Sequence, residues 1–338
     1  MAVKNSRSDD NWPQENIDTA AEAALRRRKR HREWSGAILV LLIGLAGLLA
    51  GRLGILWSRF DLFAQFSIQF AILAFAGLVG LLVPRFKGKV AGLLTVMLIV
   101  AYGLLPDINF SNPDGQLVSG EKRLKAAQFN LGGERSTIAG VVASLQALDA
   151  DVVSLVEVRA ERADLISQLK TKYPFHVDCF DQQGCEMVIV SKFPLAQTNV
   201  IGAAGPVPMI SASLGPELGG LLVIGLHTTR FPHISDQFRQ FHAIAKSLEK
   251  QSGPILVMGD FNATPQSRVL REFAARLGLS VNTYLPSWPA TYGLPQLAID
   301  HILSSASLRV LSREEAGQSA GSDHIPVALV FGVAAQAQ

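Results

Sequence analysis

Three long apolar runs near the N-terminus stand apart from the rest of the sequence. They comprise residues 34–50 with an apolar continuation past Arg52 to Trp57, residues 62–83, and residues 90–105. Each approaches the roughly 20 residues that a helix needs to cross a bilayer core. Because unpaired backbone groups are costly in lipid, such runs predict helices. We expect three transmembrane helices over residues 34–105, preceded by a cytoplasmic tail over residues 1–33.

Two other interpretations of these runs are a cleaved signal peptide and a buried helical core. No clear small-residue cleavage pattern follows the first run, and the charge-free second run is too long for a core helix. Basic residues cluster in the tail and in the loop between the second and third runs (Arg26, Arg27, Arg28, Lys29, Arg30, Arg32; Arg85, Lys87, Lys89). Positively charged loops stay in the cytoplasm. Three crossings would then place the rest of the chain outside the cytoplasm, at the cell membrane.

From about residue 123 the pattern changes to short β-branched runs that alternate with amphipathic stretches. Strands are predicted at 124–129, 152–156, 187–191, 221–226, 255–258, 299–303 and 327–331, and helices at 136–148, 159–170, 235–250 and 267–277. This alternation is typical of α/β or α+β domains, whose helices cover the faces of sheets. Residues 106–122, rich in Pro, Gly, Asp and Asn, are expected to be a linker. The domain would occupy residues 123–334.

Single polar residues follow or precede these apolar strands. They are Asn130, Glu157, His227, Asp260 with Asn262 two positions later, Asp300, and the pair Asp323-His324. Strands that end in this way can deliver side chains to one edge of a sheet, where binding sites are often built. Carboxylate and amide oxygens suit hard cations such as Mg²⁺ or Mn²⁺, and two histidines can supply an acid and a base. The sequence has no serine nucleophile elbow, glycine-rich phosphate loop or HExxH motif.

At these residues the sequence resembles the endonuclease/exonuclease/phosphatase superfamily, which includes deoxyribonucleases, exonuclease-III-like enzymes, inositol polyphosphate phosphatases and neutral sphingomyelinases. The matching stretches occur in family order: 128–130, 151–157, 188–194, Gly225-Leu226-His227-Thr228, Gly259-Asp260-Phe261-Asn262, 299–303 and Ser322-Asp323-His324-Ile325-Pro326-Val327. The Ser-Asp-His-x-Pro-Val stretch together with Gly-Asp-Phe-Asn is the most specific part. The resemblance implies a four-layer α/β/β/α sandwich with the site at one edge of the paired sheets.

The resemblance also implies roles for individual residues. Glu157 would be the main metal ligand, with Asn130 and Asp323 nearby or bound through water. His324, oriented by Asp300, would polarise the attacking water or contact the phosphoryl oxygens. Asp260 and Asn262 would position the nucleophile and phosphate, and His227 would stabilise the transition state or protonate the leaving oxygen. His301, next to Asp300, is expected to point to the opposite face and to be structural.

Composition and charge bear on the class of substrate. The chain of 338 residues is 49% hydrophobic and carries a net charge of +3, but residues 121–338 hold 18 basic and 19 acidic side chains. A near-neutral domain argues against tight nonspecific DNA binding, which depends on many phosphate contacts. Nucleic acid is still the favoured phosphoester, with lipid headgroups and small phosphoesters as alternatives. A catalytically inactive membrane-bound binding module is the alternative of another class, and no protein partner is predicted.

The two cysteines bear on the compartment. Cys179 and Cys185 flank five residues between two predicted strands. Such a pair favours a disulfide, which would require an oxidising compartment such as the periplasm if the protein is bacterial. Two reduced thiols are the alternative. A zinc site is not expected, because no histidine accompanies the pair.

Overall fold

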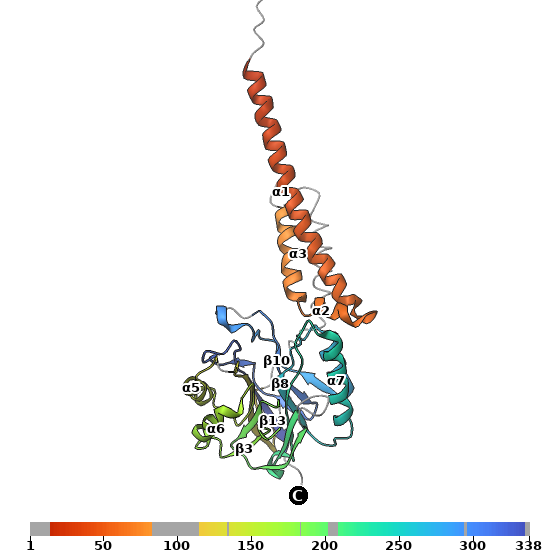
Figure 1. The fold of residues 1–338 in the computed structure, drawn as a ribbon. Coiled ribbons are helices and arrows are strands. Elements are labelled where there is room, and N and C mark those ends of the chain that lie inside the picture. The colour runs from red at the N-terminus through yellow and green to blue at the C-terminus, as the bar shows by residue number, and fades with distance from the viewer. Residues whose placement is uncertain are drawn as a thin grey trace, which may run out of the picture. The chain divides into compact units, whose positions relative to one another are not determined.

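The computed structural model describes residues 14–82, 115–133, 135–182, 184–201, 209–293 and 296–334. These residues fall into two compact units. One contains the described residues up to Ala46 and from Ile68 to 82, and the other contains Gly47–Ser67 together with the described residues from 115 onward. The second unit therefore includes a short N-terminal segment that lies far away in the sequence (Figure 1).

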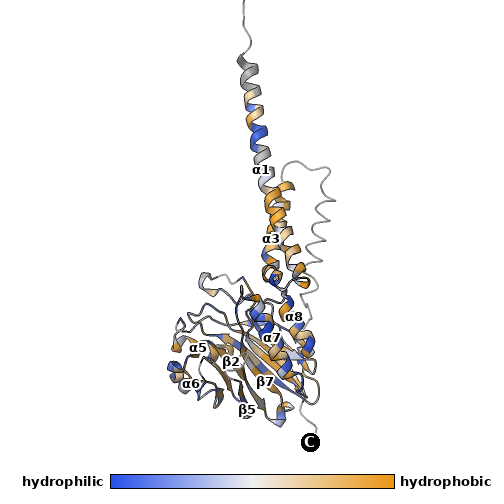
Figure 2. Cartoon of the chain, turned by 45° about the vertical axis from the view of Figure 1, so that its right-hand side comes forward, coloured by the Kyte–Doolittle hydropathy of each residue, from blue (hydrophilic) through white to orange (hydrophobic). Residues whose placement is uncertain are grey.

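Two helices form the first unit, α1 (Gln14–Arg52) and α3 (Ser67–Leu82). Figure 2 colours α3 and the C-terminal part of α1 mostly orange, the colour of hydrophobic residues. A Cβ atom at Gly44 would lie 2.4 Å from the backbone nitrogen of Ala74, and one at Gly77 would lie 2.3 Å from that of Leu41. The two backbones therefore approach each other at glycines, as membrane helices commonly do.

The apolar N-terminal region differs from the sequence prediction. In the described part of the chain one helix, Ser35–Ile55, is long and apolar enough to cross a membrane, and a second span is present only if the pair Ser58–Ala64 and Ser67–Leu81, bent by 59°, is counted as one. The described residues therefore do not contain the three predicted transmembrane helices. The third apolar run, 90–105, lies outside the described residues. Helix α1 also begins at Gln14, inside the expected tail, because Ala, Leu, Glu and Arg there are strong helix formers.

Two mixed sheets form the body of the second unit. The first has the order β11-β13-β1-β2-β4-β3, with β12 beside β13, and the second has the order β5-β6-β7-β8-β10-β9. The strands of the first sheet are β1 (Glu121–Asn130), β2 (Val152–Val156), β3 (Phe175–Asp178), β4 (Met187–Ser191), β11 (Leu308–Val310), β12 (Glu315–Ala316) and β13 (Val327–Ala334). Those of the second are β5 (Leu195–Ile201), β6 (Met209–Leu214), β7 (Leu222–His227), β8 (Ile255–Asp260), β9 (Leu279–Val281) and β10 (Asp300–Ser305).

Helices cover the outer face of each sheet. Helices α5 (Ile138–Leu148) and α6 (Ala163–Leu169) share a buried cluster with β1, β2 and β4. Helices α7 (Ile234–Leu248) and α8 (Arg268–Leu277) share another with β7, β8 and β10. A third cluster fills the space between the sheets, which gives the α/β/β/α layering (Figure 1).

The central strands explain where the polar residues appear. Strand β2 (Val-Val-Ser-Leu-Val) is buried at every position because it is covered by helices on one face and by the second sheet on the other. Such a strand can accept a charged group only where it ends. β1 and β2 run parallel in the first sheet, as β7 and β8 do in the second, so their carboxyl ends meet at one edge.

Candidate active site

One row of side chains crosses the second sheet at that edge. Asp260, the last residue of β8, pairs in register with His227 at the end of β7 and with Asp300 at the start of β10. The pairing is parallel on one side and antiparallel on the other, so three separate segments deliver polar groups to the same level. This row is the floor of the site.

Asp260 stands between the two histidines. Its Oδ2 lies 3.7 Å from His227 Nε2 and 3.8 Å from His324 Nε2. Its Oδ1 accepts a hydrogen bond from the backbone N–H of Asn262 at 2.8 Å. Burial and the neighbouring Asp300 carboxylate raise the pKa of Asp260 to about 6. The carboxylate thus titrates close to neutral pH and faces two proton carriers.

Asp300 and His324 form a buried pair. His324 Nδ1 lies 2.7 Å from Asp300 Oδ2, and the two residues are 4% and 0% exposed. Burial opposes the charged form of the imidazole, but Asp300 and Asp260 outweigh this and raise the pKa of His324 to about 9. Burial likewise opposes the charge on Asp300, yet the facing imidazolium holds the pKa of that carboxyl below its usual value. His324 is therefore fixed in orientation with Nε2 directed toward Asp260.

The first sheet contributes a more open group. Glu157 follows β2, adopts a positive φ of 57°, and its side chain is 31% exposed. Asn130 Nδ2 donates hydrogen bonds to Glu157 Oε1 at 3.1 Å and to Asp260 Oδ2 at 3.0 Å, while its oxygen accepts from Gly132 N–H. A left-handed conformation at a non-glycine residue is strained and often marks a functional position. In this arrangement Asn130 links the two sheets by orienting two carboxylates.

A glycine turn brings Asp323 to the same place. Gly132 and Gly133 have φ values of 63° and 60°, which side chains rarely adopt. A Cβ at Gly132 would lie 2.8 Å from Asp323 Oδ1, and one at Gly133 would lie 4.0 Å from Glu157 Oε2. Among the described residues Asp323 Oδ1 is buried without a hydrogen-bond partner. A buried carboxylate oxygen without a donor, close to a half-exposed glutamate, fits a hard cation.

A second acidic group is less suited to a metal. Ligand atoms of Asp260, Asp300 and His324 lie within 4.8 Å of one another. However, His324 Nδ1 and Asp300 Oδ2 already bind each other at 2.7 Å. His324 Nε2 also lies 3.8 Å from Asp260 Oδ2, so these three groups already compensate one another's charge. The Glu157 side, with the unpartnered Asp323 oxygen, is therefore the better fit for a cation.

These groups open into a cleft of about 710 Å³. Its walls also contain Arg135, Arg230, Phe231 and Trp288. Arg135 Nη1 lies 2.7 Å from Asp323 Oδ2, and Trp288 Nε1 donates to the same oxygen at 3.3 Å. Arg135 was not among the site residues predicted from the sequence. Its position five residues after Asn130, at the end of the Gly132-Gly133 turn, was the available signal.

His301 lies away from the cleft. It is fully buried, with Nε2 2.8 Å from the carbonyl oxygen of Ala263 and Nδ1 2.8 Å from Thr283 Oγ1. The carbonyl accepts only, so Nε2 carries the proton and Nδ1 accepts from the threonine. Burial lowers the pKa of His301 to about 4. This histidine is neutral and structural, as its place next to Asp300 suggested.

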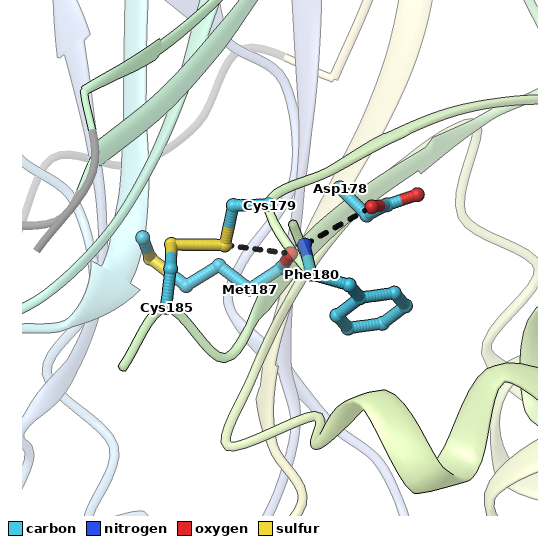
Figure 3. Close-up of a disulfide and its surroundings, with 5 residues drawn as sticks. All are labelled: Asp178, Cys179, Phe180, Cys185 and Met187. Atoms are coloured by element: carbon cyan, nitrogen blue, oxygen red, sulfur yellow. Dashed lines mark hydrogen bonds between the residues drawn. A yellow bond between two sulfur atoms is a disulfide. The ribbon is translucent and has the colours of Figure 1, made fainter. Parts of the chain in front are cut away.

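A disulfide closes the loop beside Glu157. Cys179 and Cys185 are bonded, and Met187 O lies 3.5 Å from Cys179 Sγ (Figure 3). The backbone carbonyl of Glu186 accepts from Val158 N–H at 3.0 Å. The favoured interpretation of the cysteine pair is thus the one seen in the structure, and the loop it closes contacts the residue after Glu157.

The structure brings the eight predicted site residues to one edge of the two sheets. His227, Asp260, Asp323 and His324 line the cleft with Asn262 and Glu157. Asn130 and Asp300 lie behind them and hold Glu157, Asp260 and His324 by hydrogen bonds. Asn262 has a positive φ of 46°, and its Nδ2 donates to Thr228 O, which ties the loop after β8 to the end of β7. The chemical roles of these residues remain predictions.

Comparison with known proteins gives one family. Residues 127–324 match the model of the Endonuclease/Exonuclease/phosphatase family. A stretch of 116 residues is 31% identical to a Vibrio cholerae protein described as a UPF0294 protein, covering 33% of this chain and 40% of that protein. The chain therefore matches well under half the length of this relative.

Solved structures share the fold. An endonuclease/exonuclease/phosphatase from Beutenbergia cavernae superposes with a TM-score of 0.53 at 18% identity, covering 63% of this chain and 72% of that chain. An endonuclease/exonuclease/phosphatase family protein from Bacteroides thetaiotaomicron superposes with a TM-score of 0.50 at 16% identity, covering 63% and 98%. At these identities the likeness concerns the fold alone.

Proposed function

The chain belongs to the endonuclease/exonuclease/phosphatase family, and from that premise we propose that it is a metal-dependent phosphoester hydrolase. The observation that carries this proposal is the position of Asp260 Oδ2, 3.7 Å and 3.8 Å from the Nε2 atoms of two histidines. A hydrolysis needs one group to handle the attacking water and another to serve the leaving oxygen. Two proton carriers on either side of one carboxylate meet that need.

Divalent magnesium, or manganese in its place, is the proposed cofactor. Glu157 and Asp323 would hold it, because both are carboxylates on the open side and one Asp323 oxygen is buried without a donor. Such an ion would neutralise charge that develops on the phosphoryl oxygens. Asn130, expected to be a ligand, here has its amide nitrogen facing Glu157 and Asp260. We assign it the task of holding these carboxylates apart and in place.

The proposed proton chemistry uses Asp260 and His227 of the second sheet together with His324 from the loop before β13. His324 is charged and held by Asp300, so it can donate a hydrogen bond from Nε2 to a phosphoryl oxygen or to the attacking water. Asp260, whose pKa lies near 6, is the group suited to accept a proton at neutral pH. His227, 30% exposed at the cleft, is placed to protonate the leaving oxygen. Asn262 supports this edge through its bonds to the β7 end.

The substrate is proposed to be a phosphodiester, with nucleic acid as the favoured class. Arg135 and Arg230 supply positive charge inside the cleft, and Phe231 and Trp288 supply aromatic faces. Single-stranded nucleic acid is commonly bound by basic and aromatic side chains together. A phospholipid, a sphingolipid or a small phosphoester would use the same phosphate chemistry. An inactive binding module is the competing function, although nothing in that role requires the paired Asp300 and His324.

We propose that the domain acts at the membrane and outside the cytoplasm. The basic tail and the Arg85–Lys89 loop favour the cytoplasm for those parts, and the Cys179–Cys185 disulfide favours an oxidising compartment for the domain. Asp61, between the first two apolar runs, accepts hydrogen bonds from Arg268 and Val269 of the domain. That contact requires the loop and the domain to share one side of the membrane.

Hydrolysis assays on the full chain in detergent micelles test the function. Plasmid DNA, sphingomyelin and bis(p-nitrophenyl) phosphate would each be incubated with Mg²⁺, with Mn²⁺ and with EDTA, using the wild type, Glu157→Ala and His324→Ala. We expect turnover that EDTA and both substitutions abolish, with DNA the best of the three. Absence of metal-dependent turnover on all three, with Mg²⁺ binding still measurable by calorimetry, would favour the binding module instead.

A further inference from the structure

The short segment between α1 and α3, Leu53–Phe66, is bound to the catalytic domain by side chains. We propose that this segment, here called the inter-helix segment, positions the loop after β8 and one aromatic wall of the cleft. Asp61, Gln65 and Phe66 are then positioning residues, through which a segment distant in sequence supports the active site. The proposal rests on the hydrolase function above and adds a dependence on residues outside the family-matched region.

Asp61 caps helix α8. Its Oδ1 accepts from the backbone N–H of Arg268 at 2.6 Å, and its Oδ2 accepts from that of Val269 at 3.2 Å. These are the first residues of α8, and Ser267, the N-cap residue, makes no side-chain cap hydrogen bond. A carboxylate at a helix N-terminus accepts hydrogen bonds from the unpaired backbone N–H groups and interacts favourably with the helix dipole. The inter-helix segment thus supplies the cap that the local sequence does not.

Gln65 holds the loop between β8 and α8. Its Oε1 accepts from the backbone N–H of Thr264 at 2.7 Å. Thr264 lies two residues after Asn262 and four after Asp260. The same loop is held internally by the hydrogen bond from Asn262 N–H to Asp260 Oδ1. Gln65 and Asp61 therefore fix the loop from outside, at its middle and where it enters α8.

Phe66 extends the contact to the cleft wall. Its ring packs edge to face against Phe231 with centroids 5.6 Å apart, and Phe231 packs in the same way against Trp288 at 6.2 Å. Phe231 and Trp288 line the cleft, and Trp288 Nε1 donates to Asp323. A row of three aromatic rings thus connects the inter-helix segment to a proposed metal ligand.

The polar side chains of the inter-helix segment are buried against the domain. Asp61 and Gln65 are 0% and 1% exposed, although both lie between strongly apolar sequences. A buried carboxylate or amide is costly unless it is hydrogen-bonded. Arg268 adds a further bond from Nη1 to the carbonyl of Gly54 at 2.6 Å. Polar groups at these positions are explained by the backbone donors of the catalytic loop, and a passive linker would not need them.

The test uses the full chain in micelles, four variants of the segment and one control variant. Asp61→Ala removes the cap, Gln65→Met removes the acceptor at nearly constant size, and Phe66→Ala removes the ring, with Phe66→Tyr as its conservative partner. Leu56→Ala is the matched control, because Leu56 lies in the same segment and is 81% exposed. The measurements are kcat and KM for bis(p-nitrophenyl) phosphate, and amide hydrogen exchange in peptides that cover 259–270.

We expect Asp61→Ala and Gln65→Met to lower kcat by about 10- to 100-fold with little change in KM, since small displacements of reacting groups cost this much. Exchange at Asn262, Thr264, Arg268 and Val269 should accelerate in both. Phe66→Ala should raise KM about 10-fold, because cleft walls hold substrate, and Phe66→Tyr should restore it. Leu56→Ala should behave like the wild type.

Two results would overturn the inference. One is unchanged kcat in Asp61→Ala and Gln65→Met together with unchanged protection of Asn262. The other is acceleration at Thr264, Arg268 and Val269 with normal kcat and a protected Asn262, which would reduce the contact to simple anchoring. Failure of the hydrolase proposal looks different. The wild type would then lack turnover while the protection of Asn262 still depended on Asp61 and Gln65.

Discussion

The two sides of the cleft differ in how their charges are satisfied. On one side, Asp260 and Asp300 from the second sheet and His324 from the loop before β13 are at most 4% exposed and bonded to one another or to neighbouring donors. On the first sheet the Glu157 side chain is 31% exposed, and Asp323 keeps one buried oxygen without a partner. The buried side is complete as it stands and fixes the positions of protons. The open side has negative charge that protein donors leave partly uncompensated, which a cation would correct.

The largest expected effect is on the open side. Glu157→Ala should lower kcat by about 10³-fold or more, as removal of a main source of transition-state stabilisation does, and should weaken Mg²⁺ binding in calorimetry. Glu161→Ala, an exposed acid in the next short helical turn, is the matched control and should change neither quantity. Equal Mg²⁺ affinity in Glu157→Ala and the wild type would remove Glu157 from the metal site.

On the buried side, loss of the acid–base pair should be nearly as severe. His324→Ala should lower kcat by about 10²- to 10⁴-fold, the usual contribution of a positioned proton carrier. Asp300→Asn should follow at about 10²-fold, because the imidazole keeps a neighbour but loses the carboxylate that holds it charged. Both variants should retain Mg²⁺ affinity within a few-fold. A large loss of affinity would instead favour a cation among Asp260, Asp300 and His324.

The buried Asp300–His324 pair predicts that the folding stability of the metal-free chain depends on pH. The pKa of His324 is raised from 6.5 to about 9, so its contribution to folding is complete below pH 6.5 and is lost as the pH rises through 9. A shift of this size corresponds to about 3 kcal/mol. The melting temperature of the wild type in EDTA should fall more steeply between pH 6.5 and 9.5 than that of His324→Gln. Parallel curves would show that the buried pair is not charged.

His301 offers a test of whether a buried histidine affects turnover when it lies away from the cleft. His301 is as buried as His324, but its nitrogens bind Thr283 and the carbonyl of Ala263. His301→Gln should lower stability by about 1–3 kcal/mol, the cost of disturbing buried hydrogen bonds, while kcat stays within about threefold of the wild type. Thermal unfolding and kcat measured on the same sample decide this. A loss of kcat comparable to that of His324→Ala would show that His301 supports the reaction directly.

The sequence predicted the two sides of the cleft better than their surroundings. Strands at 152–156 and 187–191 were predicted with the bounds observed for β2 and β4, because short, valine-rich and mostly apolar runs favour buried strands. Six strands were not predicted: β3, β11 and β12 of the first sheet, and β5, β6 and β9 of the second. Four of them, β3, β5, β9 and β11, stand at the ends of the strand orders, and β6 is Met-Ile-Ser-Ala-Ser-Leu, in which small polar residues interrupt the apolar pattern.

Other features depend on contacts that no local pattern contains. The eight site residues were identified from strand ends and from motif order, which are local signals. The orientation of the Asn130 amide is set by Glu157 and Asp260, the latter 130 positions away. Asp61 belongs to no motif in the sequence, yet its partners lie 207 and 208 positions later. A single acid between apolar runs indicates that something must compensate it, but the sequence does not identify the donor.

The smallest expected effect concerns the disulfide, which closes a short loop next to the open side. Cys179→Ser with Cys185→Ser should lower stability by roughly 2 kcal/mol, since closing a loop of this size removes little entropy from the unfolded chain. The chain after Glu157 contacts Glu186, which follows the disulfide ring: Val158 N–H donates to its carbonyl, and Arg159 Nε lies 3.6 Å from its carboxylate. The open side therefore depends on the disulfide weakly, and we expect kcat to fall less than fivefold while Mg²⁺ affinity falls slightly. A loss of kcat as large as that in Glu157→Ala, without unfolding, would mean that the position of Glu157 is set by this loop more than by β2.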